Sequence, residues 1–232
     1  QVQEGQAITL VNGLQSISLQ GLKAALLFID SHQKRVGSET AWVGKGEEPP
    51  LSVPPAPALR AVGKVDLSQS PLSPEELNDL MDYGNERMNN SACSLDPFRR
   101  EIRVTALTDE KVLLMVSCEA GAYNTIWLAW LVSRQQPYVA RQVRLTLPFQ
   151  PPGNAARDIE LINASIDERR HELVTLDKGR GPGDCGVQTR WRYDGQRFSL
   201  VRYAQQPQCD NWQGPDAWPT LWVTRYIFHP RD

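Results

Sequence analysis

The nine residues from Lys178 to Gly186 combine reactive side chains with an unusual backbone. Lys178 and Arg180 are cations, Asp184 is a carboxylate and Cys185 supplies a sulfur, while the other positions are four glycines and a proline. Such a loop can bind an anion through successive backbone amides. The alternative is a structural bend in which Asp184 fixes the turn by local hydrogen bonds. We take Lys178, Arg180 and Asp184 as candidate ligand-binding residues.

Catalytic signals are weak in this chain. Cys185 as a nucleophile would need a nearby histidine, and none of the three histidines stands in a recognisable cysteine-hydrolase context. His171 and Glu172 open like a zinc-protease motif, but Thr175 stands where the second histidine would be. No Gly-x-Ser-x-Gly elbow is present. We therefore assign no catalytic residue, no metal and no cofactor.

The four cysteines are Cys93, Cys118, Cys185 and Cys209. Their even number and the absence of zinc-ligand spacing favour two disulfides and an oxidising compartment. The alternative is four free thiols buried in a cytosolic protein. A strand over 111–117 would return Cys118 toward Cys93, and a hairpin at Asp194-Gly195 would return the chain toward Cys185. We expect the pairs Cys93–Cys118 and Cys185–Cys209.

Composition narrows the class of protein. The 232 residues are 41% hydrophobic and 22% charged, which is typical of a globular chain. A net charge of −2 gives no whole-molecule attraction to nucleic acid or to an acidic membrane. No apolar run reaches the roughly 18 residues of a transmembrane helix. Because the first residue is Gln rather than Met, we expect a processed or trimmed chain.

The N-terminal third predicts a strand, a helix and a stiff connector. Residues 7–11 resemble a short strand, and Ser18 caps a helix predicted over 19–35 by its apolar spacing. Five prolines between residues 47 and 57 predict an extended, polyproline-like connector. The alternative is a strap along the surface of one domain.

These elements predict a strand–helix unit over 1–46, a proline-rich connector over 47–70 and a β-rich domain with a leading helix over 71–232. The leading helix starts with a capping box, in which Ser73 is the N-cap, Pro74 follows it and Glu76 completes the box. We expect this helix to end at Gly84.

From residue 101 onward the pattern is that of strands. Residues 112–116 form an unbroken apolar run, as in a strand covered on both faces, and residues 187–193 alternate as in a half-covered one. Asp194-Gly195 is a hairpin signal. Eight or nine short strands predict a mainly β (α+β) fold, an antiparallel β-sandwich or open barrel with two helices and disulfide bridges.

Two further groups of residues are candidate binding sites. Tyr123 and Asn124 are candidates for lining a site at a strand junction, or alternatively form a turn. Arginines on neighbouring predicted strands, together with tryptophans near the C-terminus, would form a glycan- or protein-binding face if exposed. The alternative is core aromatics beside a solvated basic face. The residues concerned are Arg190, Arg192, Arg202, Arg225, Trp212, Trp218 and Trp222.

Several blocks together resemble domain-of-unknown-function family 1176, a family of exported bacterial proteins. They are residues 21–26 with 33–37, Cys118 with 121–124, 178–186, the hairpin 191–195 with Phe198, and Cys209 before Trp218 and Trp222. The resemblance covers most of the chain. It implies a periplasmic or otherwise exported protein, with no assigned activity and no catalytic residues to carry over.

The chain departs from that family at its N-terminus, where members carry a further cysteine-containing region. Residues 17–22 also resemble the closing segment of invasion-associated locus B proteins. On this interpretation residues 1–46 are the remnant of an upstream domain.

We therefore expect an exported envelope protein, periplasmic or secreted, that binds a protein or a cell-wall glycan without catalysis, in an inhibitor-like manner. An envelope hydrolase that uses scattered carboxylates is the alternative, and a purely structural role is the third possibility. No nucleic-acid partner is expected, and the oligomeric state is left open.

Overall fold

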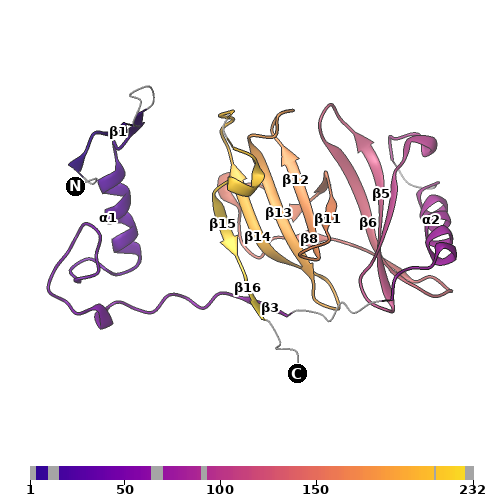
Figure 1. Ribbon diagram of the computed structural model, residues 1–232, viewed down its shortest axis with the longest axis horizontal. Coiled ribbons are helices and arrows are strands. Elements are labelled where there is room, and N and C mark those ends of the chain that lie inside the picture. The colour runs from indigo at the N-terminus through magenta and orange to yellow at the C-terminus, as the bar shows by residue number, and fades with distance from the viewer. Residues whose placement is uncertain (1–3, 10–15, 64–69, 90–92, 212, 228–232) are drawn as a thin grey trace. The chain divides into compact units, whose positions relative to one another are not determined.

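The computed structural model describes residues 4–9, 16–63, 70–89, 93–211 and 213–227 (Figure 1). The chain divides into two compact units, residues 1–58 and residues 59–232. Strand β3 (Ala61–Gly63) belongs to the second unit, where it pairs in parallel with β16 (Arg225–Ile227). The organisation expected from the sequence, with its connector over 47–70, stays a prediction.

The first unit contains a short hairpin and one helix. Strands β1 (Ala7–Thr9) and β2 (Ser16–Ser18) pair antiparallel, and helix α1 spans Leu22–His32. The helix is shorter than predicted because Ser18 ends β2 instead of capping the helix. Gly21, which precedes the helix, has a φ of 83°, a left-handed value that glycine adopts at little cost. Residues 10 and 11 of the first predicted strand lie outside the described residues.

A buried carboxylate fastens the end of α1 to the loop that follows it. The two carboxylate oxygens of Asp30 accept the backbone N–H groups of Trp42 and Val43 at 3.0 and 2.8 Å. Burial alone would raise the pKa of Asp30, but these hydrogen bonds and the charge of Arg35 outweigh it and lower the pKa below its ordinary value. Beyond this loop, Pro50–Ser52 forms a single 3-10 turn.

Helix α2 (Pro74–Asn89) begins with the predicted capping box. The N–H of Glu76 donates to Ser73 Oγ at 3.1 Å, and the N–H of Ser73 donates to the Glu76 carboxylate at 2.8 Å. The predicted end at Gly84 is wrong. Gly84 lies inside the helix, where a Cβ would come within 3.1 Å of the Leu114 side chain, so glycine here permits close packing on the sheet. In the described part of the chain, neither helix is long and apolar enough to cross a membrane.

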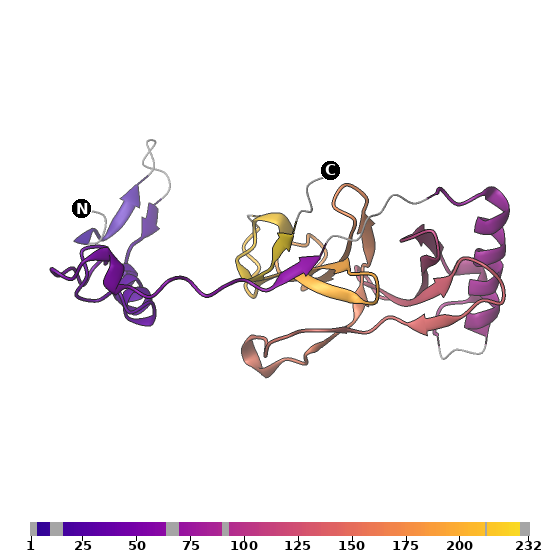
Figure 2. The same ribbon diagram turned by 90° about the horizontal axis from the view of Figure 1, so that it is seen from below.

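Two antiparallel sheets form the body of the second unit (Figures 1 and 2). The first has the order β10-β6-β5-β4, with β7 also paired to β6, and the second has the order β11-β12-β13-β14-β15. The first sheet contains β4 (Ile102–Ala106), β5 (Lys111–Ala120), β6 (Thr125–Ser133), β7 (Ala140–Gln142) and β10 (Leu161–Ile162). The second contains β11 (Ser165–Asp167), β12 (Glu172–Lys178), β13 (Gly186–Tyr193), β14 (Phe198–Gln206) and β15 (Thr220–Val223). A separate hairpin pairs β8 (Leu145–Thr146) with β9 (Asp158–Ile159).

The first sheet is covered on both faces, as the apolar run at 112–116 predicts. Leu113 and Met115 point into a core shared with the second sheet. Val112, Leu114 and Val116 point into another core, under α2. This alternation follows from the two-residue period of a strand.

The resulting order of layers is helix, sheet, sheet. Figure 2 shows α2 along one side of the first sheet. Trp191 and Leu173 of the second sheet fill the core between the two sheets. Neither sheet closes on itself, so the predicted fold class, a mainly β sandwich or open barrel with two helices, is confirmed.

Two disulfides join Cys93 to Cys118 and Cys185 to Cys209. This is the sequential pairing expected from the strand returns. The first bridge ties the chain after α2 to β5, and the second ties the turn before β13 to the segment after β14.

Candidate functional site

The turn between β5 and β6 lies against the end of β12. The Tyr123 hydroxyl donates to the Gly179 carbonyl at 3.2 Å. The Asn124 amide donates to the Lys178 carbonyl at 3.0 Å, and its oxygen accepts the Lys178 N–H at 3.2 Å. The structure thus brings three predicted residues together, with their polar groups engaged in joining the two sheets. Their role in ligand binding stays a prediction.

Asn163 extends this contact and was not singled out in the sequence. Its amide nitrogen donates to Asn124 Oδ1 at 2.7 Å and to the Leu176 carbonyl at 2.8 Å. Its φ of 45° is left-handed, which asparagine tolerates better than most residues. Asp177 accepts from Asn124 at 3.2 Å, yet burial raises the pKa of Asp177 against the effect of this hydrogen bond.

Arg180 and Asp184 form a second, separate group. The guanidinium contacts both carboxylate oxygens, with Nε at 2.8 Å from Oδ1. Asn211 joins them, since its N–H donates to Asp184 at 2.6 Å and its side-chain oxygen accepts from Arg180 at 2.7 Å. Arg180 above all, and then the Asn211 N–H, hold the pKa of Asp184 well below its usual range despite its burial. These contacts fix the bend through Asp184, and a ligand-binding role of Arg180 and Asp184 stays a prediction.

Asp184 also lies within 4.8 Å of the sulfur atoms of Cys185 and Cys209. Both sulfurs belong to the disulfide, so this grouping offers no thiolate to a metal.

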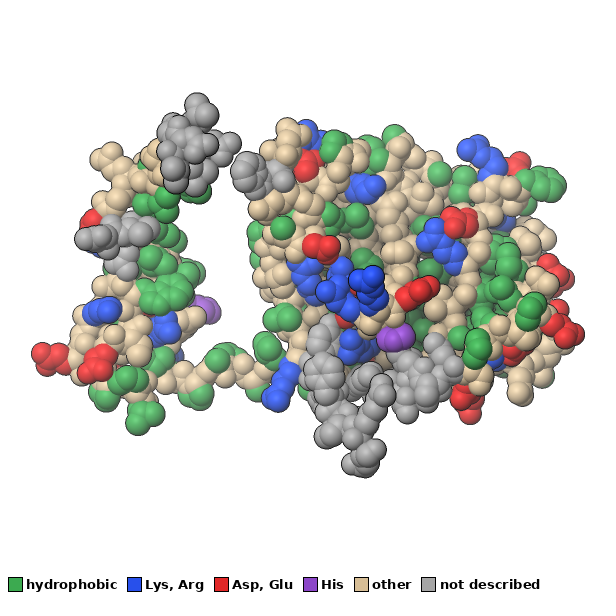
Figure 3. All heavy atoms as spheres, viewed as in Figure 1, with side chains coloured by type: hydrophobic (Ala, Val, Ile, Leu, Met, Phe, Trp, Pro, Cys, Tyr) green, Lys and Arg blue, Asp and Glu red, His purple; other side chains and the backbone are tan. Residues whose placement is uncertain are grey.

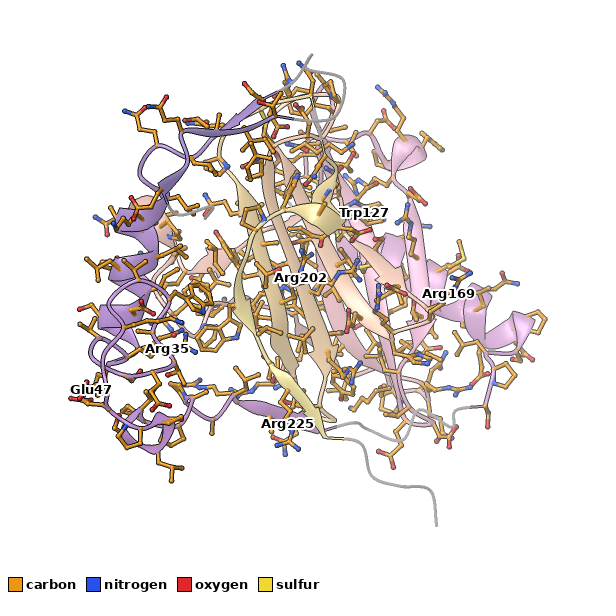
Figure 4. All side chains as sticks on the ribbon, turned by 60° about the vertical axis from the view of Figure 1, so that its left-hand side comes forward. Arg35, Glu47, Trp127, Arg169, Arg202 and Arg225 are labelled. Atoms are coloured by element: carbon orange, nitrogen blue, oxygen red, sulfur yellow. A yellow bond between two sulfur atoms is a disulfide. The ribbon has the colours of Figure 1, made fainter. Side chains whose placement is uncertain are left out.

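Basic side chains gather on the outer face of the second sheet, with acidic ones beside them (Figure 3). Arg190 pairs with three carboxylates, those of Asp167 at 2.9 Å, Glu172 at 3.4 Å and Asp216 at 3.1 Å. Arg192 lies 3.5 Å from Glu172. Arg202, labelled in Figure 4, donates to the carbonyl of Trp218 at 3.3 Å. In these contacts, Arg190, Arg192 and Arg202 already pair with other groups of the same chain.

The tryptophans expected beside these arginines do not form one exposed face with them. Trp218 is buried, Trp222 lines a different hollow, and Trp212 lies outside the described residues. Trp218 is therefore a core aromatic residue, as in the alternative interpretation.

A hollow of about 480 Å³ lies beside the inner face of the second sheet, away from the face that carries Arg190 and Arg192. Six segments line it: β3 with Arg60, residues 144 and 146–148, Arg157, Trp191 of β13, residues 197–200 at the start of β14, and the C-terminal residues Trp222 and Thr224. β3 is held there by its parallel pairing with β16, and Figure 2 shows it beside the C-terminal strands. The hairpin of β8 and β9 brings the second and third of these segments together.

Four arginines line this hollow, which we call the arginine pocket: Arg60, Arg144, Arg157 and Arg197. No aspartate or glutamate is among its lining residues, all of which belong to the described ranges. A hollow with one sign of charge concentrates ions of the other sign. Guanidinium groups match carboxylates and phosphates in shape as well as in charge. The arrangement is chemically suited to an anion.

The arginines keep hydrogen-bonding capacity for a ligand. Arg157 is oriented by the Leu147 carbonyl, which accepts from its Nε at 2.9 Å and its Nη2 at 2.7 Å, leaving its Nη1 free of any hydrogen bond to a described residue. Among the described residues, the Arg197 guanidinium has only a long contact, 3.9 Å, with Asp194. Arg144 makes no ion pair or side-chain hydrogen bond with any residue that the structure places.

Trp222 forms an aromatic wall of the pocket. Phe149 stacks on its ring with 5.0 Å between centroids, and the Arg60 guanidinium lies over the ring at 5.9 Å. These partners occupy the ring, so it offers no free platform for a sugar. The indole N–H is buried and finds no acceptor in the described chain.

Nothing in the sequence grouped these four arginines. They come from separate segments between residues 60 and 197, and the only local signal is the hairpin turn just before Arg197.

Comparisons with known proteins agree with the resemblance in the motifs. A family model described as "Protein of unknown function (DUF1176)" matches residues 1–225. A protein of Escherichia coli (strain K12), described as "Uncharacterized protein YpfG", is 68% identical over 224 residues. The match covers 97% of this chain and 64% of that protein, so the chain spans less than two thirds of this relative. No solved structure matches. The chain belongs to the DUF1176 family.

Proposed function

We propose that this chain is an exported bacterial binding module that holds an anionic ligand in the arginine pocket without changing it chemically. The observation that carries the proposal is the lining itself, to which the described residues contribute four guanidinium groups and no carboxylate. A ligand that bears a carboxylate or a phosphate would replace water around these groups and accept several charge-assisted hydrogen bonds.

The same lining supports binding over catalysis. A glycoside hydrolase needs two carboxylates facing each other across its substrate, and this pocket has none among its lining residues. Asp177, whose pKa is raised, is not among the residues that line it. The alternative of an envelope hydrolase therefore draws no support from this site.

Export is supported by the two disulfides, because such bridges persist in oxidising compartments. The similarity to an Escherichia coli protein fits a bacterial periplasm. Fractionation of bacteria that express the full-length protein should recover it in the periplasm or the medium. Recovery in the cytosol with reduced thiols would contradict export.

Ligand binding can be tested with simple anions. Isothermal titration of the chain with inorganic phosphate, citrate and glucuronate should detect binding of at least one of them, with glucose as the neutral control. The double variant Arg144→Gln/Arg197→Gln should bind about tenfold or more weakly, because two charged donors are removed. Affinity should also fall as salt is added.

The matched control is Arg169→Gln, an exposed arginine outside the pocket, which should bind the anion like the unaltered chain. Equal affinity of the double variant and the control would overturn the proposal. Failure of all three anions to bind at low salt would do the same.

A further inference from the structure

Each large sheet of the second unit ends, on the same side of the sandwich, in an edge strand whose outer edge pairs with no other strand of the described residues. β4 ends the first sheet and β11 ends the second. The two strands approach each other without pairing. The link between them is a side chain, since Arg103 of β4 donates to the Ala164 carbonyl just before β11 at 3.2 Å.

Two hollows follow this seam. One, of about 250 Å³, is lined by residues 105–107 and, across the seam, by Ile166, Glu168 and His171, with Tyr193 and Phe198 at its base. The other, of about 370 Å³, is lined by Arg99, Glu101 and Arg103 and, across the seam, by residues 163–165. Consecutive residues of the same two segments line both hollows. We call the whole the β4–β11 seam.

The two ends of the seam differ in chemistry. At the first hollow, Leu107 and Ile166 provide apolar side chains, and Leu107 belongs to the core between the sheets. At the second hollow, Arg103 is already engaged by Glu101 at 2.7 Å and by the Trp127 ring at 4.3 Å. Arg99 is exposed, and its side chain has no ion pair or hydrogen bond with a described residue. The seam thus offers an apolar hollow at one end and an unpaired cation at the other.

The turn that carries Arg99 is held rigidly. The Cys93–Cys118 disulfide anchors its start. The Asp96 carboxylate accepts the Phe98 N–H at 3.0 Å, and the Arg100 guanidinium donates to the Leu95 carbonyl at 3.0 Å. The Phe98 side chain is nonetheless fully exposed. A fixed turn that presents an aromatic and an arginine loses little entropy on binding and resembles an interface hot spot.

We propose that the β4–β11 seam binds an extended peptide segment of a partner protein, which adds its backbone to the open edge of β4. The peptide places an apolar side chain in the 250 Å³ hollow and a carboxylate against Arg99. The open edge supplies backbone hydrogen-bonding groups, and the side chains on either side supply specificity, as in other cases of strand addition. This site is separate from the arginine pocket and does not depend on the function proposed for it.

The geometry restricts the peptide. Arg103 and Thr105 of β4, and Leu107 just after it, lie at every second position and line the seam. An added strand has the same period, so its apolar and acidic residues must be an even number of positions apart to lie on the same face.

Selection of random 12-residue peptides displayed on phage tests the proposal. The chain should select peptides with an apolar residue and an acidic residue at this spacing. A synthetic peptide of that sequence should slow amide hydrogen exchange at residues 102–106. Arg99→Glu should weaken its binding about tenfold or more, and replacing its acidic residue by Lys should restore binding to this variant.

Thr105→Phe provides the second test, because it fills the apolar hollow and should abolish binding. Lys45→Glu, at an exposed lysine of the first unit, is the matched control and should bind the peptide unchanged. If Thr105→Phe fails to fold, the charge swap between Arg99→Glu and the Lys-containing peptide still tests the proposal. Selected peptides without the pattern, or equal affinity for Arg99→Glu and the control, would overturn the proposal.

Discussion

Removal of the Cys185–Cys209 disulfide should destabilise the protein without displacing the loop that the bridge closes. The two cysteines are 24 residues apart. In the chain-entropy model, opening a loop of this length costs about 3.5 kcal/mol of unfolding free energy, because the unfolded chain gains freedom. For a unit of this size that corresponds to a melting temperature about 7–14 °C lower.

The native loop should remain in place because non-covalent contacts join the same two segments. Asp184 accepts the Asn211 N–H at 2.6 Å, and Arg180 donates to the Asn211 side chain at 2.7 Å. The double variant Cys185→Ala/Cys209→Ala should therefore keep the near-ultraviolet circular dichroism of the unaltered protein while its urea midpoint falls. Adding Arg180→Ala to it should then loosen the loop, because only the hydrogen bond from the Asn211 N–H to Asp184 would remain of these links.

The control is Cys93→Ala/Cys118→Ala, which opens a loop of 25 residues. Because the model depends almost entirely on loop length, the two double variants should lose similar stability. Urea unfolding followed by circular dichroism measures both losses. A loss below about 1 kcal/mol in both variants would refute the entropic argument. Alkylation of all four thiols in the denatured, unreduced protein would refute the disulfides themselves.

Three further predictions concern packing, backbone and charge. Leu80→Ala, in the core under α2, should cost about 3 kcal/mol in urea unfolding because it leaves a cavity, and a loss under about 1 kcal/mol would contradict that packing. Gly186→Ala should lower the melting temperature far more than Gly181→Ala. A Cβ at position 186 (φ 136°) would overlap the Asp177 carbonyl, whereas a Cβ at position 181 would have no atom within 4 Å. Equal effects of the two substitutions would contradict this geometry. Asp177→Asn should raise the melting temperature at pH 7 and not at pH 3. The raised pKa of Asp177 means that the folded state disfavours the charged form, so its contribution to stability is full below the ordinary pKa of 3.8 and is lost as pH rises from there through the raised pKa of the folded state. A less stable variant at pH 7 would reverse this assignment.

Local signals in the sequence were sufficient wherever neighbouring residues supply both partners of an interaction. The capping box of α2 needs only Ser73 and Glu76, three positions apart, and both of its hydrogen bonds are present. The hairpin at Asp194-Gly195 joins β13 and β14 as predicted, with the Asp194 N–H donating to the Arg197 carbonyl at 3.0 Å. Strand direction then brought each pair of cysteines together.

Predictions failed where a distant neighbour decides the outcome. Because glycine is a poor helix former, the sequence predicts that the helix ends at Gly84. In the fold it is the point where α2 approaches Leu114 of the sheet, so packing outweighs propensity. Distant neighbours also decide the surroundings of Arg190, which meets Asp167 and Asp216 from segments on either side of it in the sequence. A binding role for this arginine face stays a prediction.

Alternation, capping and turn residues were enough to specify a bridged, mainly β fold, because each depends on contacts within a few residues along the chain. The arginine pocket and the β4–β11 seam arise only when the sheets are stacked. Arg60 and Arg197 become neighbours around one hollow through a parallel pairing between β3 and β16 that no local pattern encodes. Surface charge acquires a role only after folding determines which charges find partners and which remain free for a ligand.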